Sequence, residues 1–381
     1  MGAENAPQSY NIRKIIEVPL ATQPYRVYVG AHTLGNFPQW LRAVAPEITR
    51  VLIVADHNTG SPFGIALRDA LNQSGIRAGL QLIGQGEAAK SLDTVRDVWL
   101  ALSLAGAARD SAAIALGGGV VGDVTGFAAA TYMRGIPLIQ VPTTLLAQVD
   151  SAIGGKTGIN FRIEDEGLLI KNLLGAFHQP RAVLADVALL QTLPDRHYRS
   201  GLAEVIKYGA IMDEAFFDHV AETLPEILER NQDLLIEIVA HCCALKARVV
   251  SADERETSGY RSILNFGHTY GHAIESLDMT GITHGEAVAK GMVAAAKTAE
   301  LLALCDPSVV ERIIDVVRRA GFDPRFPDLD LHAVLSAMER DKKVRGGQLT
   351  LVLPTRLGEV RLVRDVSSSA LREAMVWCQS L

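Results

Sequence analysis

The pattern of hydrophobic and polar positions changes about halfway along the chain. In the first part, short apolar runs alternate with amphipathic stretches that have a helical period, such as residues 64–74 and 91–104. Strands that alternate with helices predict a mainly parallel sheet with helices on its faces. The apolar runs that we predict to be strands are residues 25–30, 50–56, 79–84, 111–119 and 137–144.

The second part is dominated by long segments with a period of about 3.6 residues. We predict helices at residues 197–208, 233–253, 264–277 and 285–304, and strands only at 349–355 and 360–363. The pattern is interrupted at Pro180, in the stretch "GAFHQP". We therefore expect an α/β domain of residues 1–178, followed by a mostly α-helical domain of residues 179–381.

Composition narrows the class of protein and of ligand. A chain of 381 residues can bury two cores, and 48% hydrophobic with 21% charged residues is typical of globular proteins. The net charge of −6 argues against a nucleic-acid-binding surface, which is normally basic. Cationic side chains at a functional site must then be gathered locally, which favours a small anionic ligand.

The cysteines and the apolar runs indicate a cytoplasmic protein. The four cysteines, at positions 242, 243, 305 and 378, have no Cys-x-x-Cys spacing and form no dense framework, as in reducing compartments. The first residues lack the apolar core of a signal peptide. No run approaches the roughly 18 apolar residues of a membrane span.

A glycine-rich stretch, "AIALGGGVVGDVTG", joins a predicted strand to a predicted helix. Gly117, Gly119 and Gly122 have the G-x-G-x-x-G spacing that lets backbone N–H groups approach a pyrophosphate. A turn in which glycine serves only packing is the simpler alternative. The acidic residue usually found about 20 positions later is missing until Asp150, so we expect Asp56 to hold the adenosine end instead.

Two histidines lie four residues apart in "LNFGHTYGHAIE". On a helix, His268 and His272 project from the same face, which suits a metal, a phosphate pocket or an ordinary helix surface. Zinc proteases have Glu directly after the first His, and Thr269 stands there in this chain. A protease is therefore disfavoured.

Seven blocks in order resemble the 3-dehydroquinate synthase family: "GGGVVGD", "VPTTLLAQVDSAIGGKTGIN", "KNLLGAFHQP", "GLAEVIKYG", "LNFGHTYGHAIE", "HGEAVAKGM" and "DKK". The resemblance implies an NAD-binding domain, a metal-binding domain, an active site in the cleft between them, and a homodimer. It also implies that 3-deoxy-D-arabino-heptulosonate 7-phosphate is converted to 3-dehydroquinate and phosphate. NAD+ is consumed and regenerated in each turnover, and a divalent ion, zinc or cobalt, is required.

The resemblance also assigns roles to individual residues. The implied metal ligands are Glu204, His268 and His284. The implied catalytic groups are Lys156, Lys207, Glu204, Asp150, Glu256 and His272, and His272 is a substrate or phosphate contact. The implied substrate contacts are Arg134, Asn172, Lys246, Arg261, Asn265 and Lys342, with Lys343 as an alternative to Lys342. The implied NAD contacts are Asp56, Asn58, Gly86, Glu87, Lys90, Ser91, Gly119, Val120, Val121, Gly122, Asp123, Thr143, Thr144, Lys156, Lys171, Leu189, Leu190, Gln191 and Thr192.

The chain departs from the family pattern at residues 161–170, "FRIEDEGLLI", where we expect a longer loop. Extra loop length costs little free energy, so we expect the fold to survive. The extension adjoins Lys171 and Asn172, whose positions it affects most directly. A smaller difference is one extra residue between Glu256 and Arg261.

Three alternatives have the same general architecture. Other sugar-phosphate cyclases act on sedoheptulose 7-phosphate or glucose 6-phosphate, but Arg261, Asn265 and His272 favour a substrate with a carboxylate. Metal-dependent alcohol dehydrogenases of this superfold release NADH. A non-catalytic NAD-binding regulator would have lost the metal ligands or the lysines, and all of them are present.

Overall fold

The computed structural model describes residues 10–163, 168–277, 281–344 and 349–381, and the chain forms two compact units. The first unit contains Met1–Leu193 and Gln232–Arg255, and the second contains Pro194–Asn231 and Glu256–Leu381. This division differs from the expected boundary at 178/179. Strand β9 (Ala182–Asp186) pairs with β2 and β6 of the main sheet, and helix α9 (Gln232–Ala252) packs against β1, so both belong to the first unit.

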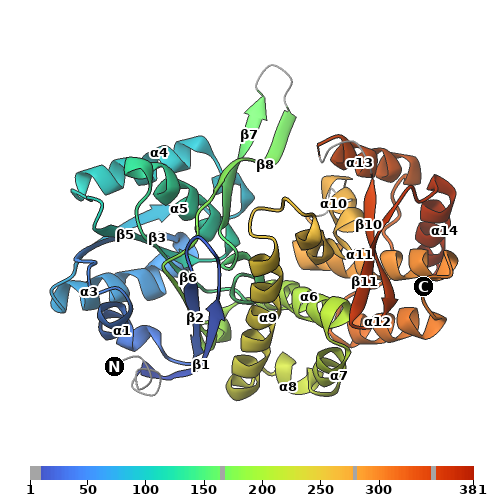
Figure 1. The fold of residues 1–381 in the computed structure, drawn as a ribbon, viewed down its shortest axis with the longest axis horizontal. Coiled ribbons are helices and arrows are strands. Elements are labelled where there is room, and N and C mark those ends of the chain that lie inside the picture. Colours follow the sequence, from blue (N-terminus) through green and yellow to red (C-terminus); the bar gives the residue numbers. More distant parts are fainter. Residues whose placement is uncertain (1–9, 164–167, 278–280, 345–348) are drawn as a thin grey trace. The chain divides into compact units, whose positions relative to one another are not determined.

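The first unit is built on a seven-stranded sheet with the order β1-β2-β9-β6-β5-β3-β4. Strands β1, β2, β3, β5 and β6 of this sheet are labelled in Figure 1. Only the pair β1–β2 is antiparallel, so the predicted mainly parallel sheet is confirmed. The predicted strands form, whereas β1 and β9 were not predicted. Besides β9, the strands are β1 (Ile12–Val18), β2 (Tyr25–Gly30), β3 (Arg50–Asp56), β4 (Arg77–Ile83), β5 (Ser111–Gly117) and β6 (Leu138–Pro142).

Two hydrophobic cores cover the two faces of this sheet. Ile53 of β3 belongs to the core with α1 and α3, whereas its neighbour Val54 belongs to the core with α4 and α5. Successive strand residues point to opposite faces, so the helices lie on both sides. The helices of the first unit besides α9 are α1 (Phe37–Val44), α2 (His57–Thr59), α3 (Ile65–Gln73), α4 (Leu92–Leu104) and α5 (Gly119–Thr131). The shorter helical turns are η2 (Leu34–Asn36), η3 (Gly60–Gly64), η4 (Glu87–Ala89), η5 (Tyr132–Arg134), η6 (Ala147–Ser151) and η8 (Val187–Thr192).

A hairpin of β7 (Lys156–Ile163) and β8 (Leu168–Phe177) takes the place of the predicted long loop (Figure 1). Phe161 pairs with Ile170, and the pairing continues to Ile163 opposite Leu168. The expectation of a loop over 161–170 was therefore wrong for the described residues, because Phe161, Ile163 and Ile170 are aromatic or β-branched residues, which favour strands. Residues 164–167 lie outside the described part.

The second unit is mostly helical, as predicted, with one small hairpin. Its central helix, α11, is buried along most of its length, and it packs against α6, α10, α12, α14 and β10. The helices are α6 (Asp195–Met212), α7 (Glu214–Glu222), α8 (Leu224–Leu228), α10 (His268–Leu277), α11 (His284–Leu301), α12 (Pro307–Arg319), α13 (Leu331–Val344) and α14 (Ser368–Gln379). The hairpin consists of β10 (Thr350–Arg356) and β11 (Glu359–Arg364).

One predicted helix, 264–277, begins later than expected. Residues up to Asn265 form the 3-10 turn η9 (Tyr260–Asn265), and Gly267 then has a φ of +78°. A left-handed residue interrupts a right-handed helix, so His268 is the first residue of α10 rather than an interior one. Among the described residues, no helix is both long and apolar enough to cross a membrane.

Candidate functional site

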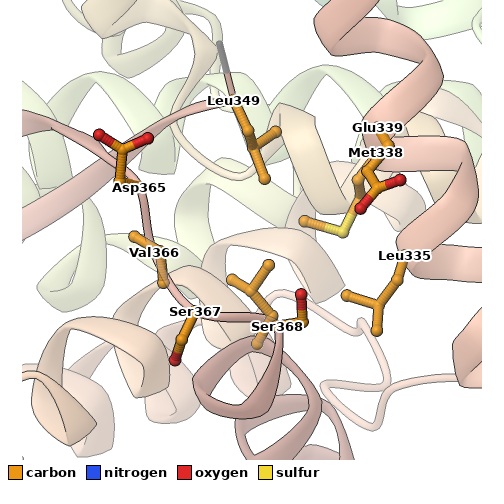
Figure 2. Close-up of a pocket in the computed structure, with 9 residues that line it drawn as sticks. Leu335, Met338, Glu339, Leu349, Asp365, Val366, Ser367 and Ser368 are labelled. Atoms are coloured by element: carbon orange, nitrogen blue, oxygen red, sulfur yellow. The ribbon is translucent and has the colours of Figure 1, made fainter.

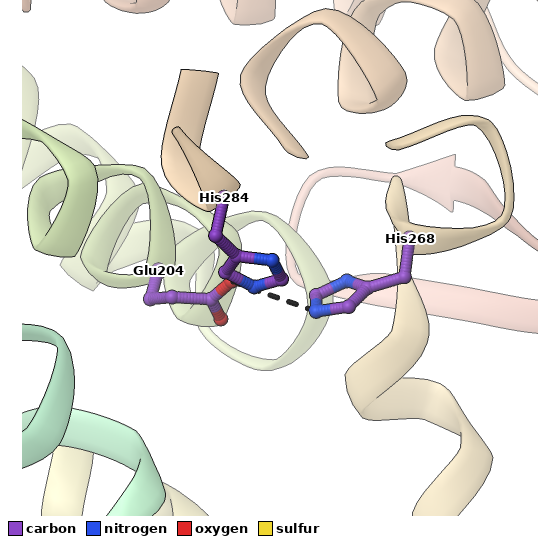
Figure 3. Close-up of side chains that lie close together, drawn as sticks. All are labelled: Glu204, His268 and His284. Atoms are coloured by element: carbon purple, nitrogen blue, oxygen red, sulfur yellow. Dashed lines mark ion pairs between the residues drawn. The ribbon is translucent and has the colours of Figure 1, made fainter. Parts of the chain in front are cut away.

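Three helices of the second unit bring the predicted metal ligands together (Figure 3). Glu204 lies in α6, His268 opens α10 and His284 opens α11, and one ligand atom from each lies within 4.8 Å of the others. Nε2 of His268 is 3.7 Å from Oε1 of Glu204, and Nε2 of His284 is 3.6 Å from the same oxygen. The carboxylate is almost completely buried.

The start of α11 is fixed by a capping box. The Thr283 hydroxyl accepts a hydrogen bond from the Glu286 backbone N–H, and the Glu286 carboxylate accepts one from the Thr283 N–H. Arg196 of α6 also donates to Glu286, over 3.0 and 2.8 Å. Because His284 is the first residue of α11, these contacts set the direction in which its side chain leaves the helix. The sequence "THGE" carries this signal of a helix start, with Thr283 three residues before Glu286.

Glycines allow the backbones around the two histidines to approach closely. A Cβ atom on Gly291 of α11 would overlap the carbonyl oxygen of Gly267, which precedes α10. A Cβ atom on Gly285 would overlap the backbone of Ser200 in α6, whose hydroxyl accepts a hydrogen bond from the Gly285 N–H at 2.9 Å. The close approach of α6, α10 and α11 therefore requires residues without side chains.

We expect Gly291→Ala to lower the free energy of unfolding by about 1–3 kcal/mol, because the added methyl group must push two backbones apart. The melting temperature should fall by several degrees, and the affinity for Zn²⁺ should fall with it. Gly35→Ala is the control, since nothing lies within 4 Å of the Cβ position at Gly35. A Gly291→Ala protein with the melting temperature and metal affinity of the control would contradict the packing argument.

The Nδ1 atoms of His268 and His284 also lie close to oxygen atoms of the protein. Nδ1 of His268 lies 3.1 Å from the carbonyl oxygen of Phe266, and Nδ1 of His284 lies 3.4 Å from Oε2 of Glu275. A carbonyl oxygen only accepts, so the proton of neutral His268 resides on Nδ1 and the lone pair of Nε2 faces Glu204. A carboxylate behind a histidine is typical of metal ligands. Glu275 was not predicted, although it lies about two helical turns after His268.

The two imidazoles have opposite pKa shifts. Burial, with the nearby Lys207 ammonium, lowers the pKa of His268 to about 3. Burial also acts to lower the pKa of His284, but hydrogen bonds to Glu204 and Glu275 prevail and raise it to about 10. The carboxylates of Glu204 and Glu275 therefore favour positive charge on the His284 ring, which lies between them.

The donor set fits a catalytic divalent ion. One carboxylate and two imidazoles provide three ligands and leave further positions open, as in catalytic zinc sites. Zinc bonds of about 2.0–2.2 Å place neighbouring ligand atoms roughly 3.4 Å apart. The observed separations of 3.6 and 3.7 Å need little adjustment. Lys207 forms an ion pair with Glu204 from one helical turn further along α6, as its spacing predicted.

Other predicted groups of the second unit lie beside these ligands or on η9. The His272 ring centroid is 5.4 Å from that of His268 and 6.3 Å from that of His284. Arg261 is 3% exposed, with Nε 3.7 Å from Oε1 of Glu256, and the φ of Glu256 is +56°. The remaining members are Asn265, which ends η9, and Lys342, which lies in α13 with a side chain outside the described residues.

The glycine-rich turn lies at the carboxyl edge of the parallel sheet. Strand β5 ends at Gly117 and α5 begins at Gly119, so the predicted strand–turn–helix context is confirmed. The Thr143 N–H, just after the neighbouring strand β6, donates to the Gly117 carbonyl at 3.0 Å. Asp56 ends β3, on the other side of β5, where its Oδ1 accepts from backbone N–H groups of the following turn. This edge is where open α/β sheets bind ligands.

A cluster around the buried Lys90 gathers four predicted residues of the first unit. Lys90 is 5% exposed, and its Nζ lies 2.7 Å from Oδ2 of Asp123 and 3.8 Å from Oε1 of Glu87. It also donates to the side-chain carbonyl of Asn172. The structure thus brings together three predicted NAD contacts and one predicted substrate contact.

The other predicted residues of the first unit are distributed over its loops and strands. Lys246 of α9 donates to the Asp150 carboxylate at 2.9 Å. The Arg134 turn has an unusual backbone, with φ values of +51° at Met133 and +67° at Arg134, as strained functional turns often have. The rest are Asn58 in α2, Gly86 before η4, Ser91 at the N-cap of α4, Val120, Val121 and Gly122 in α5, Thr144 after β6, Lys156 in β7, Lys171 in β8, and Leu189, Leu190, Gln191 and Thr192 in η8.

A separate pocket of the second unit lies beside α13 and the start of α14 (Figure 2). Apolar side chains, including Leu335, Met338 and Leu371, line it together with Glu339 and Asp365. None of the predicted site residues whose side chains the structure describes lines this pocket. It is therefore distinct from the metal-ligand cluster.

Comparison with known proteins gives the same family in both halves of the chain. The model described as "3-dehydroquinate synthase N-terminal" matches residues 80–200, and "3-dehydroquinate synthase C-terminal" matches residues 201–344. The 3-dehydroquinate synthase of Vibrio atlanticus is 42% identical over 368 residues, which are 96% of this chain and 99% of the relative. That of Symbiobacterium thermophilum is 44% identical over 355 residues, or 93% of this chain and 97% of the relative.

Solved structures agree on the fold. A 2-epi-5-epi-valiolone synthase from Streptomyces hygroscopicus, with NAD+ and Zn²⁺ bound, has a TM-score of 0.83 and 28% identity, covering 93% of this chain and 97% of its own. A 2-deoxy-scyllo-inosose synthase, complexed with carbaglucose-6-phosphate, NAD+ and Co²⁺, has a TM-score of 0.82 and 27% identity, covering 95% and 99%. An NADH-dependent butanol dehydrogenase from Thermotoga maritima shares only the fold, with 13% identity, a TM-score of 0.65, and coverage of 93% and 97%.

Proposed function

The chain belongs to the 3-dehydroquinate synthase family, and we propose that it converts 3-deoxy-D-arabino-heptulosonate 7-phosphate to 3-dehydroquinate and phosphate. The observation that carries this proposal is the convergence of Glu204, His268 and His284, with Lys207 and His272 beside them. The likeness to relatives of that name, over nearly the whole chain, supports it.

We propose NAD and a divalent metal, zinc or cobalt, as cofactors. The glycine turn at the carboxyl edge of the sheet supports NAD binding, and the three-ligand cluster supports the metal. Two solved relatives hold NAD+ together with Zn²⁺ or Co²⁺. When bound, NAD+ takes up and returns a hydride, and the divalent ion lowers the pKa of the substrate alcohol.

The residues of the chain bind and orient an anionic substrate. We assign the substrate carboxylate to the buried Arg261, with Asn265 beside it, because guanidinium binds carboxylates through two parallel hydrogen bonds. We assign the substrate phosphate to Arg134 and His272. Oxidising the secondary alcohol to a ketone acidifies the neighbouring C–H, so phosphate leaves by elimination once that proton is removed. Asp150 and Glu256 are the carboxylates we place near this step.

A second candidate function is cyclisation of a sugar phosphate without a carboxylate, which the names of the two solved cyclases suggest. Identity of 27–28% to those proteins is well below the 42–44% to the 3-dehydroquinate synthases. The higher identity therefore favours the substrate with the carboxylate.

We expect the purified protein, loaded with Zn²⁺, to release phosphate from the heptulosonate phosphate with NAD+ present at far less than stoichiometric amounts. The phosphate released should exceed the NAD+ supplied many times over, because NAD+ is regenerated in each turnover. A phosphate assay measures the phosphate, and absorbance at the NADH wavelength measures any NADH that accumulates. Steady NADH accumulation, or faster turnover of sedoheptulose 7-phosphate, would overturn the proposal.

We also propose a cytoplasmic homodimer. Met133, next to Arg134 in the strained turn, is 45% exposed, and an exposed apolar side chain beside a cation suits a contact with a second copy of the chain. All four cysteines are free thiols, as is usual in a reducing compartment.

A further inference from the structure

The hairpin of β7 and β8 contains an irregularity at Asn160. Ile159 pairs with Leu174, and Phe161 pairs with Ile170, so the single residue Asn160 stands opposite the three residues 171–173. These extra residues form a bulge in β8, and bulges redirect side chains near functional sites. Asn172, inside the bulge, has a φ of +54°, a left-handed conformation that asparagine tolerates better than most residues.

The side-chain amide of Asn160 both accepts and donates a hydrogen bond. Its Oδ1 accepts a hydrogen bond from the backbone N–H of Asn172 at 2.9 Å, inside the bulge. Its Nδ2 donates to Oε1 of Glu87 at 2.8 Å. Its backbone N–H donates to the carbonyl of Lys90 at 3.0 Å, and the residue is only 6% exposed. One buried amide therefore links the bulge in β8 to the η4 segment.

The groups on either side of Asn160 are those of the Lys90 cluster. Asn172 places its side-chain carbonyl on the Lys90 ammonium, and Lys90 pairs with Asp123 of α5. Without a donor at position 160, Glu87 would lose the bond that directs its carboxylate. Without an acceptor there, the left-handed backbone of Asn172 would lose the bond that holds it.

We infer that Asn160 is a positioning residue. Its side-chain amide orients both Glu87, for contact with NAD+, and Asn172, for contact with the substrate. This rests on the proposed function, in which Glu87 contacts NAD+ and Asn172 contacts the sugar-acid phosphate. Asn160 touches neither ligand in this account and acts through its two neighbours. Because its donor and acceptor serve different neighbours, the two effects are separable by substitution.

The test uses Asn160→Asp and Asn160→Ala in the full-length protein, with Arg162→Ala as a control. Arg162 is exposed, lies two residues further along β7 and has no part in the cluster. The dissociation constant for NAD+ is measured by titration calorimetry without substrate, at pH 8 and pH 6, for each variant and the wild type. The KM for the heptulosonate phosphate, kcat and the melting temperature are measured in parallel.

Asn160→Asp keeps the acceptor for Asn172 but places a second carboxylate against Glu87. We expect the NAD+ dissociation constant to rise about tenfold at pH 8, as for loss of a hydrogen bond to a charged group, with little change in KM. The charged groups around position 160 are Glu87, Lys90 and Asp123. Two carboxylates in contact share a proton at lower pH, so NAD+ affinity should recover towards the wild-type value at pH 6.

Asn160→Ala removes donor and acceptor together. We expect both the NAD+ dissociation constant and the KM to rise about tenfold, with no recovery at pH 6. The pH comparison is made within one variant, so a general folding defect does not imitate recovery. An NAD+ affinity unchanged in Asn160→Asp, or equal losses in both variants at both pH values, would overturn the inference.

Failure of the proposed function gives a different result. In that case the wild-type protein would bind NAD+ without releasing phosphate from the heptulosonate phosphate. The comparison of NAD+ dissociation constants between the wild type and Asn160→Asp needs no turnover, so it tests the role of Asn160 at Glu87 in either case.

Discussion

Replacing His284 with alanine should weaken the binding of Co²⁺ or Zn²⁺ by more than about 100-fold. Removing a residue that only hydrogen-bonds to a metal ligand lowers metal affinity by about 100-fold at most, and loss of the ligand itself should have a larger effect. The substitution removes one of three ligand atoms that lie within 4.8 Å of one another. Competition with a chelator measures the affinity. The visible spectrum of the Co²⁺-loaded protein, which depends on the ligand set, gives a second readout that does not depend on activity.

Two matched variants test the assignment of roles. Glu275→Gln keeps the size of the residue whose carboxylate lies 3.4 Å from Nδ1 of His284, and it should weaken metal binding only about 10- to 100-fold. His272→Ala should leave metal affinity within about threefold and should instead raise the KM. Equal metal affinity in the His284→Ala and His272→Ala proteins would show that the ligand has been misassigned.

Mixing two inactive proteins should restore activity if each site uses Arg134 from a second copy of the chain. Arg134→Ala lacks the phosphate contact, and His284→Ala lacks a metal ligand, so each homodimer should have less than about 1% of wild-type activity. In a mixed dimer, the site on the Arg134→Ala chain keeps its own His284 and receives the intact Arg134. The other site lacks both.

The expected yield is therefore about half of wild-type activity per mixed dimer, for sites that turn over independently. Differently tagged chains, purified through both tags, establish that exchange has taken place. A pair of Arg134→Ala and Arg134→Lys chains provides the control, since its two defects affect the same residue and cannot complement each other. Mixed dimers that remain inactive would place Arg134 in the site of its own subunit.

Strands β3, β5 and β6 were predictable because each is a short run of mainly apolar residues. Such runs are typical of parallel strands that are buried on both faces, and the central residues of all three strands are buried. The edge strand β1 was missed because its exposed positions break the run. The start of α10 was misplaced because Leu264 continues the helical period up to Gly267, whose left-handed backbone cannot be read from periodicity.

The domain boundary could not be predicted from the pattern of residues along the chain. Helix α9 has the same long helical period as α6 and α11, so periodicity groups all three together. Its membership in the first unit depends on contacts with β1, β2 and η6. Contacts between segments more than 200 residues apart leave no local signal in the pattern of either segment.

The sequence by itself determined the family and the fold class, and it singled out Glu204, His268 and His284 as predicted metal ligands, because residue types at fixed local spacings are recorded directly in the chain. The tertiary structure alone decided which atoms meet. Glu275 stands behind His284, and Asn160 joins Glu87 to the bulge at Asn172. Both depend on side chains brought together by helix packing and by strand register. A hydrogen bond between distant residues is set by distances of a few tenths of an ångström, which only the folded chain specifies.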